Sequence, residues 1–174
     1  MELNEIIKNC RIAFDKAGLD FDHFGIEVSI NGRLKTTLGR CKGKYINEVY
    51  TPFAIEFSKQ LVETSTEKSI LDVIYHECAH AIADIETGER NGHNATFKRV
   101  CARIGTDNDG SCTKDLERTV PEDQIYKYFV VCEKCGGTNK YHRAGKVIKN
   151  IQFYNCKCGG KLKVIQNFYR IYTE

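Results

Sequence analysis

The sequence lacks long apolar runs, internal repeats and low-complexity segments. A transmembrane helix needs about 20 consecutive apolar residues, so no membrane-spanning helix is expected. The first residues, Met1 to Glu5, contain no basic n-region of a secretory signal. We therefore expect a soluble intracellular protein with no membrane partner. Its expected location is the cytoplasm or nucleoid in a prokaryotic or phage context, and the nucleus in a eukaryote.

Histidine is also scarce, with five residues in 174, yet two of them form the pattern H-E-x-x-H. The pattern reads His76-Glu77-Cys78-Ala79-His80. Residues four apart lie on one face of a helix, so both imidazoles can bind one Zn²⁺ while Glu77 reaches a water molecule on it. The alternative is a chance arrangement on an ordinary helix.

The segment around this pattern has the features of a helix. Apolar residues recur on one surface between Glu67 and Glu86, with few helix breakers among them. Thr64 stands three residues before Glu67, a capping-box spacing that predicts a helix start there. Cys78 lies about 200° around the helix from His76. We therefore expect Cys78 to face the core as a small apolar residue.

A catalytic zinc usually has three protein ligands and an open position, so a third ligand must come from elsewhere. His93 is the favoured candidate, because it follows Gly92 and opens a second helical pattern that ends at Gly105. The alternative for His93 is an exposed residue at a helix start. His23 is expected in a loop or at the edge of the core. Three acidic residues remain candidates for the third ligand: Asp84, Glu86 and Glu89.

These parts together predict a zinc hydrolase. Zinc lowers the pKa of a bound water from 15.7 towards about 7 and polarises a substrate carbonyl. Glu77 is the expected general base, which takes the proton of the water and passes it to the leaving amine. Peptide hydrolysis is the usual reaction of this arrangement. The candidates for an oxyanion-stabilising residue are left unranked: Tyr45, Tyr50 and Tyr75.

Net charge divides the chain into two parts. Residues 1–123 hold 16 Lys and Arg against 21 Asp and Glu, a net charge of −5, whereas residues 124–174 hold 10 against 2, a net charge of +8. A polar irregular stretch and Pro121 lie near this boundary. The sequence therefore predicts a hydrolase domain at 1–110, a linker at 111–125 and a basic module at 126–174.

The first domain is expected to contain one helix, three strands and two more helices. Apolar residues at helical intervals span roughly 2–17 and stop at Gly18. Strands are expected at 26–30, 34–41 and 49–57. A turn at Asn31-Gly32 would pair the first two strands as a hairpin, and one face of the third would carry Phe53, Ile55 and Phe57.

The basic module contains four cysteines with the spacing of metal ligands: Cys132, Cys135, Cys156 and Cys158. Two such pairs at the tips of facing hairpins form a tetrahedral Cys₄ zinc site. A piece of about fifty residues has too small a core to fold alone, so a structural zinc is expected. His142 could replace one cysteine, and a redox C-x-x-C is the other alternative.

The local sequence of the module favours a β zinc ribbon. Gly136-Gly137 and Gly159-Gly160 follow the cysteine pairs and permit tight turns. Strands are expected at 128–131, 151–154 and 162–165. The predicted fold class is therefore α+β, with a small three-stranded sheet packed with helices, including the H-E-x-x-H helix, and a C-terminal β zinc ribbon.

The remaining cysteines are expected to be structural free thiols. Nine is an odd count, which fits a reducing compartment better than a complete disulfide framework. The thiols outside both metal motifs are Cys10, Cys41, Cys101 and Cys112.

Basic and aromatic residues alternate in the C-terminal module. Lysines neutralise phosphates and aromatic rings stack on unpaired bases, so we expect binding of DNA, with single-stranded or distorted DNA favoured. The alternative is a solvated strand face with ordinary solubility charge. The residues expected to contact DNA are Lys140, Arg143, Lys146, Lys149, Tyr154 and Lys161.

The combination of motifs resembles the SprT-like metalloprotease family, whose eukaryotic members include Spartan. The resemblance covers residues from about 5 to 165 and includes the C-terminal ribbon. The chain departs from the family pattern at Cys78, where Met is common, and in the C-x-C spacing of the ribbon. The motifs that carry the resemblance are His76 to Ala81, Gly92-His93 followed by Phe97, and Gly39-Arg40-Cys41.

The resemblance implies a zincin-like fold, zinc on His76, His80 and His93, and Glu77 as general base. It also implies proteolysis of DNA-bound or DNA-crosslinked proteins, activated by DNA, with one catalytic and one structural zinc ion. Two alternatives stay open. One is a non-catalytic, transcription-associated zinc protein that binds nucleic acid, in which a fourth ligand, Asp84 or Glu86, closes the site. The other is a peptidase without a nucleic-acid role.

Overall fold

The computed structural model describes residues 1–106, 116–120 and 125–167. The chain forms two compact units that divide between Thr119 and Val120, inside the predicted linker. Part of that linker belongs to the first unit, because the N–H of Thr66 donates to the carbonyl of Glu117 and the N–H of Thr119 donates to the carbonyl of Thr64. The predicted domain end at 110 and Cys112 lie outside the described residues.

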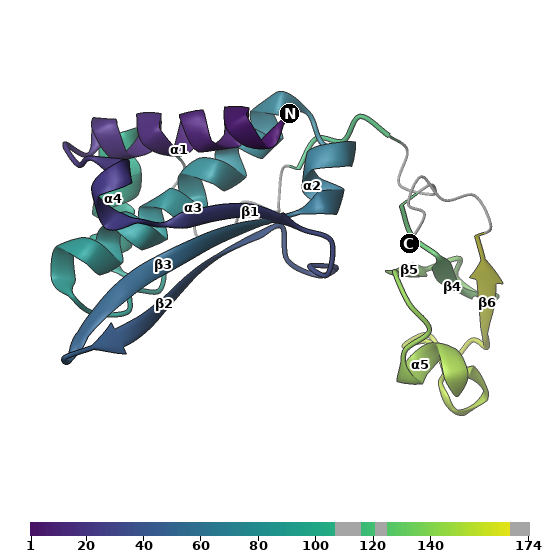
Figure 1. Cartoon of the computed structure of the whole chain (residues 1–174). Coiled ribbons are helices and arrows are strands. Elements are labelled where there is room, and N and C mark those ends of the chain that lie inside the picture. Colours follow the sequence, from purple (N-terminus) through teal and green to yellow (C-terminus); the bar gives the residue numbers. More distant parts are fainter. Residues whose placement is uncertain (107–115, 121–124, 168–174) are drawn as a thin grey trace. The chain divides into compact units, whose positions relative to one another are not determined.

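The first unit mixes helices with a three-stranded sheet, as the sequence predicts (Figure 1). One short helix was not expected from the sequence, α2. The elements in chain order are α1 (Leu3–Lys16), the 3₁₀ helix η1 (Phe21–Phe24), β1 (Glu27–Asn31), β2 (Gly39–Ile46), β3 (Val49–Ser58), α2 (Lys59–Thr64), α3 (Glu67–Thr87) and α4 (Ala95–Ile104).

The strand order, β1-β3-β2, differs from the predicted pairing. The predicted hairpin between the first two strands is wrong, because β1 pairs in parallel with β3. The chain does turn after Asn31, whose side chain accepts the N–H of Arg33. The true hairpin joins β2 to β3 through Asn47 and Glu48. Both have positive φ angles, as a tight turn that matches strand twist requires.

The predicted apolar face of β3 is correct at Ile55 and Phe57, which are fully buried, and wrong at Phe53. A register shift between Lys42 and Gly43 of β2 leaves Phe53 without a pairing partner, as in a β-bulge. Phe53 is 38% exposed, and the ammonium group of Lys42 lies 5.3 Å from the centroid of its ring. The bulge therefore removes Phe53 from the core face.

Helices α1, α3 and α4 lie on the same side of the sheet (Figure 1). Helix α3 contacts α1, α4, β2 and β3, so it occupies the centre of the unit. Its most buried apolar positions, including Val73, Ile74 and Ile82, belong to one continuous core. The helix that carries the H-E-x-x-H sequence is thus held from several sides.

The start of α3 was predicted at the right residue with the wrong cap. Thr66 is the N-cap, and its hydroxyl accepts the N–H of Ser69. Thr64 instead ends α2, where its hydroxyl donates to the carbonyl of Gln60. At the other end, Gly88 adopts a left-handed conformation that closes the helix.

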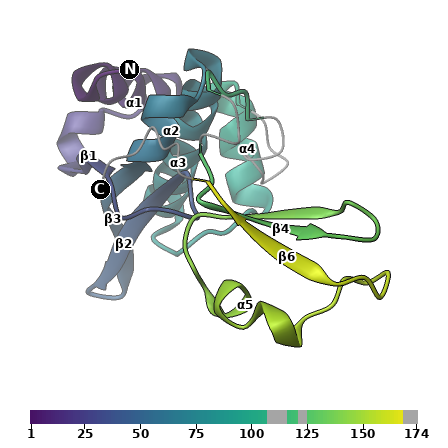
Figure 2. The same cartoon turned by 90° about the vertical axis from the view of Figure 1, so that its right-hand side faces the viewer.

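The second unit has an antiparallel sheet of order β5-β4-β6, from β4 (Tyr128–Cys132), β5 (Thr138–Tyr141) and β6 (Leu162–Gln166). Figure 2 shows α5 (Lys146–Lys149) on the connection between β5 and β6. The predicted strand at 151–154 is wrong, because Ile151–Phe153 forms the 3₁₀ helix η3. Short apolar runs do not distinguish the two conformations by periodicity.

No helix in the described ranges is both long and apolar enough to cross a lipid bilayer.

Candidate metal centres

Helix α3 presents two histidines and a glutamate at its most enclosed stretch. His76 is 7% exposed and Glu77 is 6% exposed, so both polar side chains are buried among apolar neighbours. Burial of such groups is costly unless they have partners. The four-residue spacing brings the rings of His76 and His80 to a centroid distance of 5.0 Å. The helix therefore forms one side of a potential metal site.

The loop between α3 and α4 delivers the third histidine. Asn94 is the N-cap of α4 and accepts the N–H of Phe97, and His93 directly precedes this cap. The Nε2 atom of His93 lies 3.2 Å from the Nε2 atoms of both His76 and His80. The structure thus brings together all three histidines that the sequence singles out.

The separation of these nitrogens fits a bound metal ion. A tetrahedral zinc with bonds of about 2.0–2.1 Å would place its ligand nitrogens about 3.3 Å apart. Mutual hydrogen bonds do not explain the cluster. The Nε2 atom of His93 faces two other Nε2 atoms, but a ring nitrogen of a neutral imidazole carries either one N–H or one lone pair and can form only one such bond. The three residues could hold a metal ion.

Electrostatics keeps His80 in the form that binds metals. Burial, together with the neighbouring His76 and His93, lowers the pKa of His80 to about 4. The imidazole is therefore neutral at pH 7. Its Nδ1 atom lies 3.3 Å from the carbonyl oxygen of Asn91, so Nδ1–H donates there and Nε2 keeps its lone pair for the cluster.

Asn91 fixes the loop that carries His93, and no sequence motif pointed to it. Its backbone N–H donates to Asp84 over 2.6 Å. Its side-chain amide donates to the carbonyls of Ala83 and Glu89 and to the hydroxyl of Thr87. Asn91 is only 7% exposed. It therefore joins the end of α3 to the loop and to the ring of His80.

Phe97 supports the three imidazoles from α4. Its ring centroid lies 4.4 Å from that of His80, 4.9 Å from that of His93 and 5.1 Å from that of His76. Phe97 is fully buried. The rings consequently pack on a fixed apolar surface that limits their rotation.

Glu77 belongs to α3, and its side chain lies against Gly39 of β2. Burial raises the pKa of its carboxyl group to about 7, and a hydrogen bond from the backbone N–H of Cys41 opposes this shift. A group with such a pKa can exchange a proton near neutral pH. Cys78 is fully buried, which confirms its predicted position in the core.

The acidic alternatives for the third ligand lie elsewhere. Asp84 accepts the N–H of Asn91, and Glu86 forms an ion pair with Arg103. The hydroxyl of Tyr45 donates to Glu89 over 3.2 Å. Within the described residues, the histidine cluster includes none of these carboxylates.

The structure also locates His23 and the remaining two tyrosines proposed as oxyanion-stabilising residues. Tyr75 lies under the ammonium group of Lys16, which is 4.7 Å from its ring centroid. Tyr50 packs against Gly43, where a Cβ atom would be 2.5 Å from Cε1 of its ring. His23 is an exposed residue of η1.

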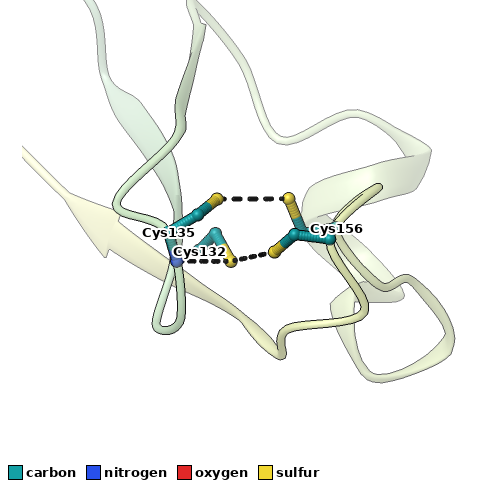
Figure 3. Close-up of side chains that lie close together, drawn as sticks. Cys132, Cys135 and Cys156 are labelled. Atoms are coloured by element: carbon teal, nitrogen blue, oxygen red, sulfur yellow. Dashed lines mark hydrogen bonds between the residues drawn. The ribbon is translucent and has the colours of Figure 1, made fainter.

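The four cysteines of the second unit also converge (Figure 3). The Sγ atoms of Cys132 and Cys158 are 3.5 Å apart, and those of Cys135 and Cys156 are 3.6 Å apart. These distances exceed a disulfide bond of about 2.05 Å and are close to the roughly 3.8 Å between sulfurs on one tetrahedral zinc. The arrangement could therefore hold a metal ion.

Hydrogen bonds prepare this cluster for a cation. The backbone N–H of Cys135 lowers the pKa of Cys132 to about 6. At Cys158, the N–H of Gly160 acts in the same direction, but the neighbouring sulfurs outweigh it and raise the pKa to about 12. Deprotonation of all four sulfurs at this distance would therefore need a positive ion beside them. Gly136 and Gly159 have positive φ angles, which confirms their predicted role in tight turns.

His142 lies outside the cysteine cluster, and its ring stacks at 4.6 Å on Tyr126. The residues expected to contact DNA are distributed over several elements of the second unit. Lys140 lies on β5, Lys146 and Lys149 on α5, and Lys161 just before β6. These four and Arg143 are exposed, whereas Tyr154 is half-buried.

Comparison with known proteins identifies the family. The chain matches the SprT-like family over residues 4–121, which includes all three histidines and Glu77. The chain belongs to the SprT-like family. A protein named SprT-like from Staphylococcus epidermidis is 31% identical over 158 residues, 89% of this chain and 90% of the relative.

Two further SprT-like relatives cover similar lengths. The protein from Staphylococcus saprophyticus is 29% identical over 144 residues, 83% of this chain and 84% of the relative. The one from Staphylococcus carnosus is 30% identical over 146 residues, 83% of each chain. The resemblance inferred from the sequence motifs is thus confirmed, and both candidate metal sites lie in a chain that covers most of the length of these relatives.

Proposed function

We propose that this SprT-like protein is a zinc-dependent endopeptidase with a zincin-like catalytic unit, and that it hydrolyses DNA-bound or DNA-crosslinked proteins. The observation that carries the proposal is the convergence of three histidine Nε2 atoms beside a buried glutamate on the same helix. In metallopeptidases, a set of imidazoles with an adjacent carboxylate usually binds zinc.

The residues divide the chemical work between them. His76, His80 and His93 would hold the metal ion, which when bound supplies Lewis acidity that activates water and polarises the scissile carbonyl. Glu77 accepts the proton of the attacking water and returns it to the leaving amine. Its pKa of about 7 suits both steps, and a dication on the neighbouring histidines favours its charged form.

The cluster of three histidines, which includes no carboxylate among the described residues, supports catalysis over a purely structural role. The non-catalytic alternative needs a fourth protein ligand, and its two candidates have other partners: Asp84 binds Asn91 and Glu86 binds Arg103. A site with three protein ligands leaves a position for water and substrate. This arrangement favours the peptidase over the adaptor.

Charge supports DNA as the partner that brings substrates to the enzyme. The segment 124–174 has a net charge of +8. Five of its basic side chains proposed to contact DNA are exposed: Lys140, Arg143, Lys146, Lys149 and Lys161. Phe153 is 78% exposed and could stack on an unpaired base. We infer that the cysteine site holds a structural zinc that folds this module.

The proposal is tested by cleavage of a DNA-binding protein in the presence of no DNA, duplex DNA or single-stranded DNA. Wild type should cut only with DNA, and Glu77→Gln should lose cleavage while keeping its zinc content and DNA affinity. Glu63→Gln is the matched control, because Glu63 is an exposed residue paired with Lys59. Equal cleavage by wild type and Glu77→Gln would refute the proposal.

A further inference from the structure

Gly39, at the start of β2, lies directly against Glu77. A Cβ atom at Gly39 would be 2.8 Å from Cγ and 3.0 Å from Oε1 of Glu77. Carbon atoms in contact are normally about 3.5–4.0 Å apart, so only a residue without a side chain permits this approach. The φ angle of Gly39 is not in the left-handed region. Space, and not backbone conformation, therefore accounts for this glycine.

Two residues further on, β2 contacts the same side chain through its backbone. The backbone N–H of Cys41 lies close enough to the carboxylate of Glu77 to act on it as a hydrogen-bond donor. The segment itself is held in place, because Gly39 pairs with Phe57 and Cys41 pairs with Ile55, both on β3 and both fully buried. One short stretch of strand thus limits the carbon chain of Glu77 and binds its oxygen.

We propose that the Gly39–Cys41 segment of β2 positions the carboxylate of Glu77 for peptide hydrolysis, with Gly39 admitting the side chain and the Cys41 amide orienting it. This inference rests on the proposed function of the metal site. The new element is that the backbone of a neighbouring strand, β2, positions the Glu77 carboxylate.

The kinetic test compares Gly39→Ala with wild type in the full-length, zinc-loaded protein, using a DNA-bound protein as substrate. Displacement of the base should lower kcat by about 100-fold while KM changes by less than about twofold. Zinc content should not change, since no histidine is touched. Gly32→Ala is the matched control, because a Cβ there meets nothing within 4 Å. A normal kcat in Gly39→Ala would overturn the proposal.

A second variant separates positioning from packing. The new methyl group of Gly39→Ala would also lie 3.1 Å from Cγ1 of Val73. Gly39→Ala combined with Val73→Ala removes that contact and retains the one with Glu77. The double variant should keep the kcat defect, with a melting temperature that shows it is folded. Recovery of kcat would show that the contact with Val73 in the core, and not the contact with Glu77, caused the defect, and it would overturn the proposal.

Amide exchange tests the contact without any enzymatic activity. In the folded protein, the Cys41 amide proton should exchange about 10-fold faster in Glu77→Ala than in wild type, because its acceptor is gone. Glu77→Gln retains an oxygen acceptor and should preserve the protection. Equal exchange in all three proteins would overturn the positioning role. A wild type that cuts nothing would refute the proposed function, and the Cys41 amide would still decide whether β2 orients Glu77.

Discussion

Asn91 is expected to couple the stability of the α3–α4 loop to metal affinity. The substitution Asn91→Ala removes an amide that donates to Ala83, Thr87 and Glu89 and accepts from Asn94. An amide has two N–H groups, so its three acceptors share two donors. The loss therefore amounts to two donated bonds and one accepted bond.

The magnitude follows from these bonds. At about 1 kcal/mol for each hydrogen bond, Asn91→Ala should lower the unfolding free energy of the first unit by about 3 kcal/mol. Asn91 also accepts from Nδ1 of His80 through its backbone, and its loop carries His93. Loss of such outer support typically weakens metal binding by about 10–100-fold.

Both candidate metal sites lie in one chain, so the cysteine site can serve as the internal reference when the affinity of the histidine site is measured. Cobalt bound to the four cysteines gives thiolate charge-transfer absorption that cobalt on histidines lacks, so a chelator titration can follow the two sites separately. The histidine site should lose cobalt at lower chelator concentration in Asn91→Ala, while the cysteine site is unchanged. Asn9→Ala is the control, because Asn9 forms an exposed bond within α1. Wild-type affinity at the histidine site would refute the coupling.

Two further predictions concern the sheet and the ribbon. Burial alone would raise the pKa of Glu56, but hydrogen bonds from Arg40, Lys42 and Asn31 lower it from an ordinary 4.5 to about 2. The ionised Glu56 carboxylate therefore stabilises the fold fully above pH 4.5, and this stabilisation is lost as the pH falls through 2. Glu56→Gln should therefore cost about 1–2 kcal/mol in urea unfolding at pH 7 and almost nothing at pH 2, and an equal cost at both pH values would contradict this account. Cys135→Ser should release one metal equivalent and collapse the amide NMR dispersion of residues 125–167 while the histidine site stays loaded. Retention of two metal equivalents and full dispersion would show that the four sulfurs do not share an ion.

The parts of the site that were predictable depend on local spacing. His76 and His80 are one helical turn apart, so the helix alone brings their rings together. The cysteine pairs are likewise local, and each needs only a tight turn at a glycine. His93 required one further inference, that the second helix begins beside the first.

The parts that were not predictable depend on contacts between segments distant in sequence. A β-bulge displaced Phe53 from the core face, and nothing in the alternation of β3 marks the position of that bulge. Asn91 lies in a polar turn and belongs to no motif, yet its bonds to Ala83 and Asp84 hold the site together. Such roles emerge only once α3 and the loop are placed against each other.

The strand order has the largest consequence for function. A hairpin of the first two strands, as the sequence suggested, would have put β2 between two partners and used the backbone groups on both of its sides. Parallel pairing of β1 with β3 instead leaves β2 at the edge of the sheet, where one row of backbone groups has no strand partner among the described residues. That freedom allows the Cys41 amide to bind Glu77. The pairing of β1 with β3, which the turn at Asn31 does not reveal, therefore leaves the Gly39–Cys41 backbone free to contact the Glu77 side chain.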